Sequence, residues 1–176
     1  MSRFERVGDE VAWEGRILSV HEERFRHEDG EEVEREILRH PGAVGIVAHD
    51  DETLWLVRQP REAVGDPALL EIPAGKLDEE GESPLQTAKR ELAEEIGKRA
   101  EQWDHLVTYW SSAGFTDEQV HVYLATGLSD ESAESGENER IDVVRWPLDQ
   151  LAGAIEQCVD AKSLIGLLVL ERRMRS

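Results

Sequence analysis

Three glutamates, Glu91, Glu94 and Glu95, lie close together in the stretch 74–98, which reads AGKLDEEGESPLQTAKRELAEEIGK. If this stretch is helical, residues 91 and 95 are one turn apart on the same side, where two carboxylates repel each other by a few tenths of a kcal/mol. Arg90 could supply part of the positive charge that removes this repulsion. A divalent cation supplies it better, because hard cations take oxygen ligands. The pattern therefore indicates either a metal site or, in a chain this acidic, a solvated acidic helix face.

The helix that must carry these glutamates has clear start and stop signals. Ser83 is a favourable N-cap, Pro84 suits the first helical position, and Gln86 is placed to complete a capping box. Gly97 is a natural stop after the last turn. With side chains about 100° apart around the axis, one apolar stripe faces the core and the first and last of the three glutamates flank it. The stripe consists of Leu85, Ala88, Leu92 and Ile96.

Strands must hold this loop and helix in place. A short apolar strand is expected to deliver Ala74 and Gly75, and glycine there lets the backbone approach another group closely. The pattern predicts strands at 43–49, 54–57, 69–73, 106–110, 120–125 and 141–146, and amphipathic helices at 148–158 and 161–172. The order of sheet, helix, sheet and helices predicts an α+β protein. Its expected architecture is an α/β/α sandwich with a mixed central sheet and flanking helices.

Residues 1–40 are expected to form an antiparallel sheet of their own. The segment 13–20 alternates, Asp29-Gly30 is a strong hairpin signal, and 33–38 returns as a strand. Such a hairpin is marginally stable alone, so it must pack on something. We therefore divide the chain into an N-terminal sheet, 1–40, and a main domain, 41–176.

The stretch 74–98 resembles the signature of the Nudix hydrolase family. The spacing is Gly75, six residues, Glu82, seven residues, Arg90-Glu91-Leu92, one residue, Glu94-Glu95, one residue and Gly97. The first gap is one residue longer than in the family pattern, and Lys98 stands where an apolar residue is usual. The longer gap lies before the helix, so it leaves the register of the helical glutamates unchanged.

The resemblance implies a Nudix fold and metal-dependent hydrolysis of a nucleoside diphosphate linked to another group, with Mg²⁺ expected and Mn²⁺ also possible. It implies that Glu82 and Arg90 hold the loop against the helix as a charge-assisted pair. The metal ligands that it implies are Ala74, through its carbonyl, Glu91, Glu94 and Glu95. It also implies a catalytic glutamate, Glu139 or else Glu137, which acts as a further metal ligand or as the base that activates water. A merely solvated loop is the alternative there.

Further residues resemble the ADP-ribose pyrophosphatase branch of that family, whose members cut ADP-ribose to AMP and ribose 5-phosphate. The residues that carry this resemblance are Glu71-Ile-Pro-Ala-Gly, Gly114-Phe-Thr-Asp-Glu118 and the strand 120–125. The chain departs from the branch at Ala113, where proline is common. The alternatives are a pyrophosphatase for another nucleoside diphosphate sugar and a Nudix module that binds nucleotides without cutting them.

Substrate-binding candidates come from residue types. Arg58 and Arg61 could grip phosphates or ribose, because the guanidinium fork suits phosphate, or they could be surface charges. Phe115 could border the nucleotide or pack in its loop. Trp13 and Trp110 are interpreted as core residues. The histidines show no metal-ligand spacing and are interpreted as structural or exposed.

Composition limits the partners. The net charge of −19, from 39 acidic and 20 basic residues, argues against binding nucleic acid or an anionic membrane. The first ten residues hold no apolar run, so we expect no signal peptide, and the apolar stretch 164–170 is too short to cross a bilayer. The single Cys158 cannot form an internal disulfide, so we expect a cytoplasmic protein. By resemblance we also expect a homodimer.

Overall fold

The computed structural model describes residues 3–132 and 140–175 and divides the chain into two compact units. The N-terminal unit comprises Met1–Gly42 and Tyr109–Gln119, and the main unit comprises Ala43–Thr108 and Val120–Ser176. Each unit is described by itself.

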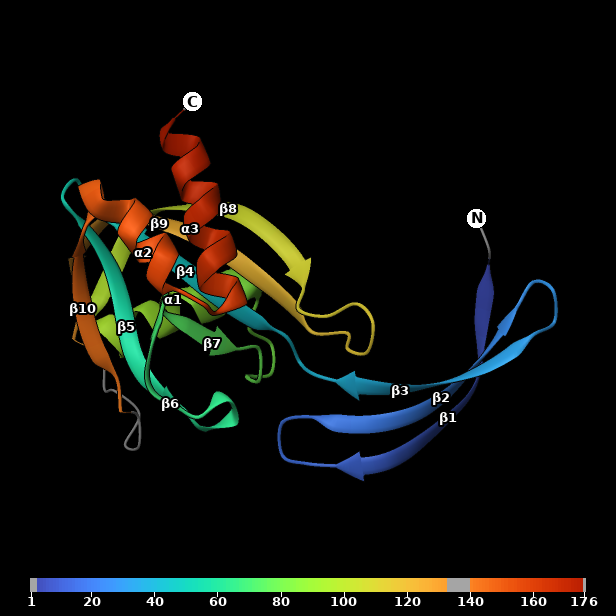
Figure 1. The fold of residues 1–176 in the computed structure, drawn as a ribbon. Helices are drawn as coiled ribbons and strands as arrows, with labels where there is room; N and C mark the ends of the chain where they lie inside the picture. The colour runs from blue at the N-terminus through green and yellow to red at the C-terminus, as the bar shows by residue number, and fades with distance from the viewer. Residues whose placement is uncertain (1–2, 133–139, 176) are drawn as a thin grey trace. The chain divides into compact units, whose positions relative to one another are not determined.

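The N-terminal unit is an antiparallel sheet of β1 (Phe4–Glu14), β2 (Ser19–His27) and β3 (Glu32–Arg39), in that order (Figure 1). The hairpin at Asp29-Gly30 is confirmed, and Gly30 has a φ of +87°, which favours glycine. The alternating segment 13–20 is not a single strand, because the chain turns there and Gly15 N–H donates to Leu18 O at 2.9 Å. A side chain on Gly15 would meet the Trp13 ring at 2.2 Å, so glycine lets the turn fold against that ring. No proline, Asn or Asp marks this turn.

The main unit is built on a seven-stranded mixed sheet. Its order is β10-β5-β4-β9-β8, with β6 added to β5 and β7 added to β4. The strands are β4 (Ala43–His49), β5 (Thr53–Arg61), β6 (Asp66–Glu71), β7 (Ala74–Lys76), β8 (Lys98–Trp110), β9 (Gln119–Asp130) and β10 (Asp142–Pro147). The central strand β4 pairs antiparallel with β5 and β7 and parallel with β9. Pairing with β7 places Gly45 opposite Ala74, which fixes the start of the 74–98 stretch.

Helices cover both faces of this sheet, because successive side chains of β4 point to opposite faces. Val44 and Ile46 pack in one cluster with Ala88 and Leu92 of α1 (Pro84–Ile96). On the other face, Gly166 of α3 (Ala161–Met174) lies so close that an added Cβ would be 2.9 Å from Val47. The helix expected over 148–158 is a short 3-10 turn followed by α2 (Leu151–Gln157). The predicted α/β/α sandwich is confirmed (Figure 1).

Several strands run further than their apolar cores predicted. β5 continues through Arg58 to Arg61, where it pairs with β6, and β8 already begins at Lys98. These extensions are polar, so the apolar pattern could not reveal them. Trp13 and Trp110 are 55% and 57% exposed, so their interpretation as core residues is wrong. Among the described residues up to Arg39, only Glu23 is buried, and this sheet therefore has no apolar core of its own.

Candidate active site

The helix α1 presents its glutamates at a fixed position. Ser83 Oγ accepts from the Gln86 N–H, the Gln86 side chain accepts from the Ser83 N–H at 2.9 Å, and Gly97 ends the helix at φ +64°. These predicted signals are all confirmed. The caps fix where the helix begins and ends, and therefore the register of the glutamates along it.

Glu91 and Glu95 flank the buried stripe and are only 9% and 8% exposed. The Arg90 guanidinium donates to Glu91 and to Glu94, both at 2.9 Å, and it also bonds Glu82 at 3.3 Å. The charge-assisted pair predicted for Glu82 and Arg90 is confirmed. Burial opposes the charge of Arg90, but the surrounding carboxylates outweigh it and raise its pKa.

The loop before the helix reaches back to the two buried glutamates. The Ala74 N–H donates to Glu95 Oε2 at 2.9 Å. Gly75 lies directly against the other glutamate, since a Cβ on Gly75 would lie 2.1 Å from the carboxyl carbon of Glu91. Gly75 does not have a positive φ, so the residue is glycine for space rather than for backbone conformation.

The donor set of this region suits a hard divalent cation. Glu95 accepts from the Ala74 N–H, Glu91 lies against Gly75, and Glu94 shares the Arg90 guanidinium with Glu91. Carboxylate and carbonyl oxygens are the ligands that Mg²⁺ and Mn²⁺ prefer. The residues present therefore fit the metal that the sequence predicts.

Beside this loop lies a charged network that the sequence did not reveal. Glu71, at the end of β6, is 1% exposed and receives a bidentate bond from Arg61, at 2.6 and 2.8 Å. Lys162 of α3 also donates to Glu71, and it donates to Asp160 at 2.9 Å. Arg58 donates to the Ala68 carbonyl at 3.1 Å. The main unit therefore holds both arginine candidates on β5, and it ties Arg61 to a buried carboxylate.

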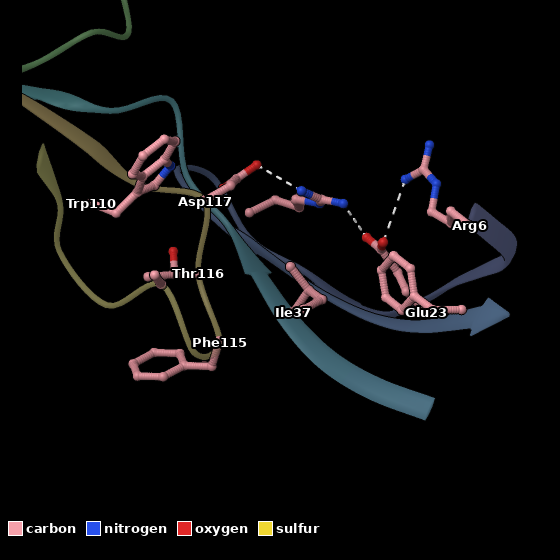
Figure 2. A pocket seen from close by; sticks show the side chains of 10 residues that line it. Arg6, Glu23, Ile37, Trp110, Phe115, Thr116 and Asp117 are labelled. Atoms are coloured by element: carbon pink, nitrogen blue, oxygen red, sulfur yellow. Dashed lines mark hydrogen bonds and ion pairs between the residues drawn. The ribbon is translucent and has the colours of Figure 1, made fainter. Parts of the chain in front are cut away.

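The N-terminal unit holds Phe115 and Ala113, which line a cavity of about 490 Å³ (Figure 2). Phe115 is 54% exposed on the loop that follows β8. Figure 2 shows Glu23 facing Arg6 in this cavity. The two side chains form an ion pair at 3.6 Å, and Arg39 also donates to Glu23. The cavity lining includes none of the glutamates of α1.

The same sheet carries the one described group of three potential metal ligands whose ligand atoms all lie within 4.8 Å, namely Asp9, His21 and Glu23. His21 bonds Asp9 at 2.7 Å, and this hydrogen bond lowers the pKa of Asp9. Because Arg6 and Arg39 already pair with Glu23, the group is an ion-pair network. The predicted catalytic residues Glu137 and Glu139 lie outside the described residues.

These features identify the class. A family profile described as NUDIX domain matches residues 39–164, so the chain belongs to the Nudix hydrolase family. Members of this family act on nucleotide derivatives and generally depend on a divalent metal ion. No helix in the described residues is long and apolar enough to cross a membrane.

Two relatives and one solved structure make the placement more specific. The chain is 37% identical to an ADP-ribose pyrophosphatase of Mycobacterium tuberculosis, over 95% of this chain and 83% of the relative. It is also 37% identical to a methanol dehydrogenase activator of Bacillus methanolicus, over 94% of this chain and 91% of the relative. A crystal structure described as ADP compounds hydrolase matches with a TM-score of 0.86 at 24% identity, over 98% of this chain and 95% of that one, and this likeness concerns the fold.

Proposed function

We propose that the protein hydrolyses the pyrophosphate bond of ADP-ribose, giving AMP and ribose 5-phosphate, and that it uses Mg²⁺. The observation that carries the proposal is the contact between the 74–75 segment and the helix α1. Ala74 bonds Glu95, and Gly75 makes room for Glu91, so two buried carboxylates and a backbone segment come together. The named activity of the Mycobacterium tuberculosis relative supports the choice of ADP-ribose.

The residues proposed to hold the metal are the Ala74 carbonyl, Glu91, Glu94 and Glu95. When bound, Mg²⁺ neutralises phosphate oxygens and lowers the pKa of a bound water. The reaction adds one water across the P–O–P link, so one phosphorus gains the water oxygen and the bridging oxygen leaves with the other. Glu139, or else Glu137, is proposed to take the proton from that water.

Arg61 and Arg58 are proposed to bind the phosphates or the ribose, and Phe115 the nucleotide. The bidentate bond to Glu71 supports the choice of Arg61, because a guanidinium held on two nitrogens keeps one orientation. A fixed donor loses less conformational entropy when it binds an anion.

A homodimer formed through residues 1–40, with 41–176 as the hydrolase domain, is proposed as well. β1 exposes Phe4, Val11 and Trp13, each by more than half, on a sheet without an apolar core. Large exposed apolar side chains are a feature of protein-binding surfaces. Sedimentation analysis of the wild type and of Trp13→Glu tests this proposal. The wild type is expected to be a dimer and the variant a monomer. We also propose a cytoplasmic location, because the lone Cys158 is a free thiol.

The test of the activity is a substrate panel with and without Mg²⁺. ADP-ribose, GDP-mannose, NADH and diadenosine polyphosphates are incubated with the protein, and phosphate-containing products are separated. Mg²⁺-dependent release of AMP from ADP-ribose is expected to be fastest. If another nucleoside diphosphate sugar is cleaved faster, that compound replaces ADP-ribose as the proposed substrate. If no compound is cleaved in a metal-dependent way, the remaining alternative is a module that binds nucleotides without cutting them.

The matched variant is Glu95→Gln. It keeps the size of the side chain and an oxygen that can accept from Ala74 N–H, but it removes the charge. Turnover is expected to fall at least about 100-fold with the fold intact. Full activity of this variant would show that Glu95 is not a metal ligand.

A further inference from the structure

The start of α3 contacts the segment that leads into the active-site loop. Lys162 is 14% exposed and bridges Asp160, the N-cap of α3, and Glu71, the last residue of β6. A lysine in this place joins two elements that are far apart in the sequence through charge-assisted hydrogen bonds.

A second bond runs beside the first. Ser163 is fully buried, and its hydroxyl accepts from the Ile72 N–H at 2.9 Å and donates to Asp160 at 2.7 Å. Ile72 follows β6 and lies outside any strand, so its N–H has no strand partner and the hydroxyl takes that place. Leaving a buried N–H without an acceptor costs about 1–3 kcal/mol.

Small residues bring α3 close enough for these bonds. A Cβ on Gly45 would lie 2.9 Å from Ile72, and a Cβ on Gly166 would lie 2.9 Å from Val47 and 3.4 Å from Ile72. The helix and the sheet therefore pack around Ile72 with no room for an additional methyl group. This packing sets the distance between Ser163 and the Ile72 N–H.

The segment from Glu71 to Ala74 is consequently anchored at every residue. Lys162 holds Glu71, Ser163 holds Ile72, Ile46 N–H donates to Pro73 O at 2.8 Å, and Ala74 N–H donates to Glu95. We propose that Lys162 and Ser163 are positioning residues, which fix this segment and through it the Ala74 backbone against Glu95. They thereby set the affinity of the site for its divalent metal, so the inference deepens the proposed function and rests on the metal site proposed there.

The electrostatics agree with this role. Burial alone would raise the pKa of Glu71, but the bonds from Arg61 and the charge of Lys162 outweigh it and lower this pKa. Burial would likewise raise the pKa of Asp160, but the charge of Lys162 and its hydrogen bond outweigh burial and lower this pKa. Both carboxylates are therefore charged at neutral pH, and Lys162 joins them.

The test measures metal binding without substrate. Mn²⁺ is titrated into the full chain, and the free ion is followed by electron paramagnetic resonance for the wild type and for Lys162→Met. We expect the variant to bind Mn²⁺ about tenfold more weakly, because loss of a residue that supports metal ligands commonly weakens metal binding by at least that factor. The affinity is measured on folded protein, well below its melting temperature. If Lys162 only stabilised the fold, the Mn²⁺ affinity of the folded variant would be unchanged.

Lys98→Met is the matched control. Lys98 is 17% exposed and pairs with Asp130, so it resembles Lys162 in burial and charge, but its partners are Asp130 and the Trp55 ring rather than the 71–74 segment. Its Mn²⁺ affinity is expected to stay within about twofold of the wild type. A loss in Lys98→Met as large as in Lys162→Met would overturn the inference.

Ser163→Ala serves if Lys162→Met does not fold, and it is expected to weaken Mn²⁺ binding in the same direction. Wild-type Mn²⁺ affinity in both folded variants would refute the inference. The outcome also separates the two proposals. If the wild type cleaves no ADP-ribose while the variants still bind Mn²⁺ more weakly, the substrate is wrong and the positioning role stands.

Discussion

Gly75→Ala tests whether the approach of the loop to the helix matters for catalysis. The added Cβ would lie 2.1 Å from both the carboxyl carbon and Oε1 of Glu91, against an ordinary contact of 3.4 Å. The Glu91 carboxylate, or the loop, must therefore give way by about 1.3 Å, the difference between these distances. Glu91 is buried and bonded to Arg90, so it has little room to move without losing that bond.

The expected effect on turnover is large. A misplacement of about 1 Å at a reacting centre costs about 100-fold in rate. Gly75→Ala is therefore expected to lower kcat on ADP-ribose about 100-fold and to raise the Mg²⁺ concentration needed for half-maximal rate. The assay is initial-rate AMP formation over a Mg²⁺ series, together with thermal unfolding to verify that the variant is folded.

The matched control is Gly153→Ala in α2. There the added Cβ would meet Trp146 at an ordinary 3.4 Å, and alanine favours a helix over glycine by about 1 kcal/mol. This control is expected to keep wild-type kinetics and to be slightly more stable. If Gly75→Ala also kept kcat and Mg²⁺ dependence within about threefold, steric control of Glu91 by Gly75 would be refuted.

Three further outcomes are expected. Arg90→Met leaves Glu91 and Glu94 without their shared cation, so it is expected to destabilise the fold by about 2 kcal/mol in urea unfolding, with Mg²⁺ restoring part of the loss; no loss would contradict the pairing. The pKa of Glu71 in the folded state is below its ordinary value of 4.5. The ionised Glu71 therefore stabilises the fold fully above about pH 4.5, and this stabilisation is lost as the pH falls through the folded-state pKa. The stability gap between wild type and Glu71→Gln should therefore narrow below about pH 4.5 in urea unfolding, and a constant gap would exclude this linkage. Burial, followed by the charges of Asp160 and Glu71, raises the pKa of the Cys158 thiol to about 11, so a disulfide reagent at pH 8 should react rapidly only after unfolding.

Local signals predicted the central helix well. Ser83, Gln86 and Gly97 act within a few residues of each other, so their roles follow from spacing alone. The strand β4 was also predictable, because its side chains are buried on both faces and its sequence is therefore a continuous apolar run. The ends of the strands were not predictable, because polar residues such as Arg61 extend β5 through backbone pairing with β6.

The supporting network around Glu71 could not be predicted from spacing. Lys162 and Glu71 are 91 residues apart, and neither has a periodic pattern that points to the other. The nearest signal was Asp160 three residues before Ser163, which marks a helix start but not its partner. Arg61 was a candidate for substrate binding or a surface charge, and only the fold reveals that two of its nitrogens are bonded to Glu71.

The pairing of β4 has a consequence for how the protein is made. Val44 and its neighbours pair with β9, more than 70 residues later in the chain, and the 71–74 segment is held by residues of α3 that come later still. A chain emerging from the ribosome therefore carries the whole glutamate helix well before the strand and helix that fix its surroundings exist. Contacts of such long sequence separation form late and slowly. The proposed metal site is consequently among the last parts of the molecule to reach its final geometry during synthesis.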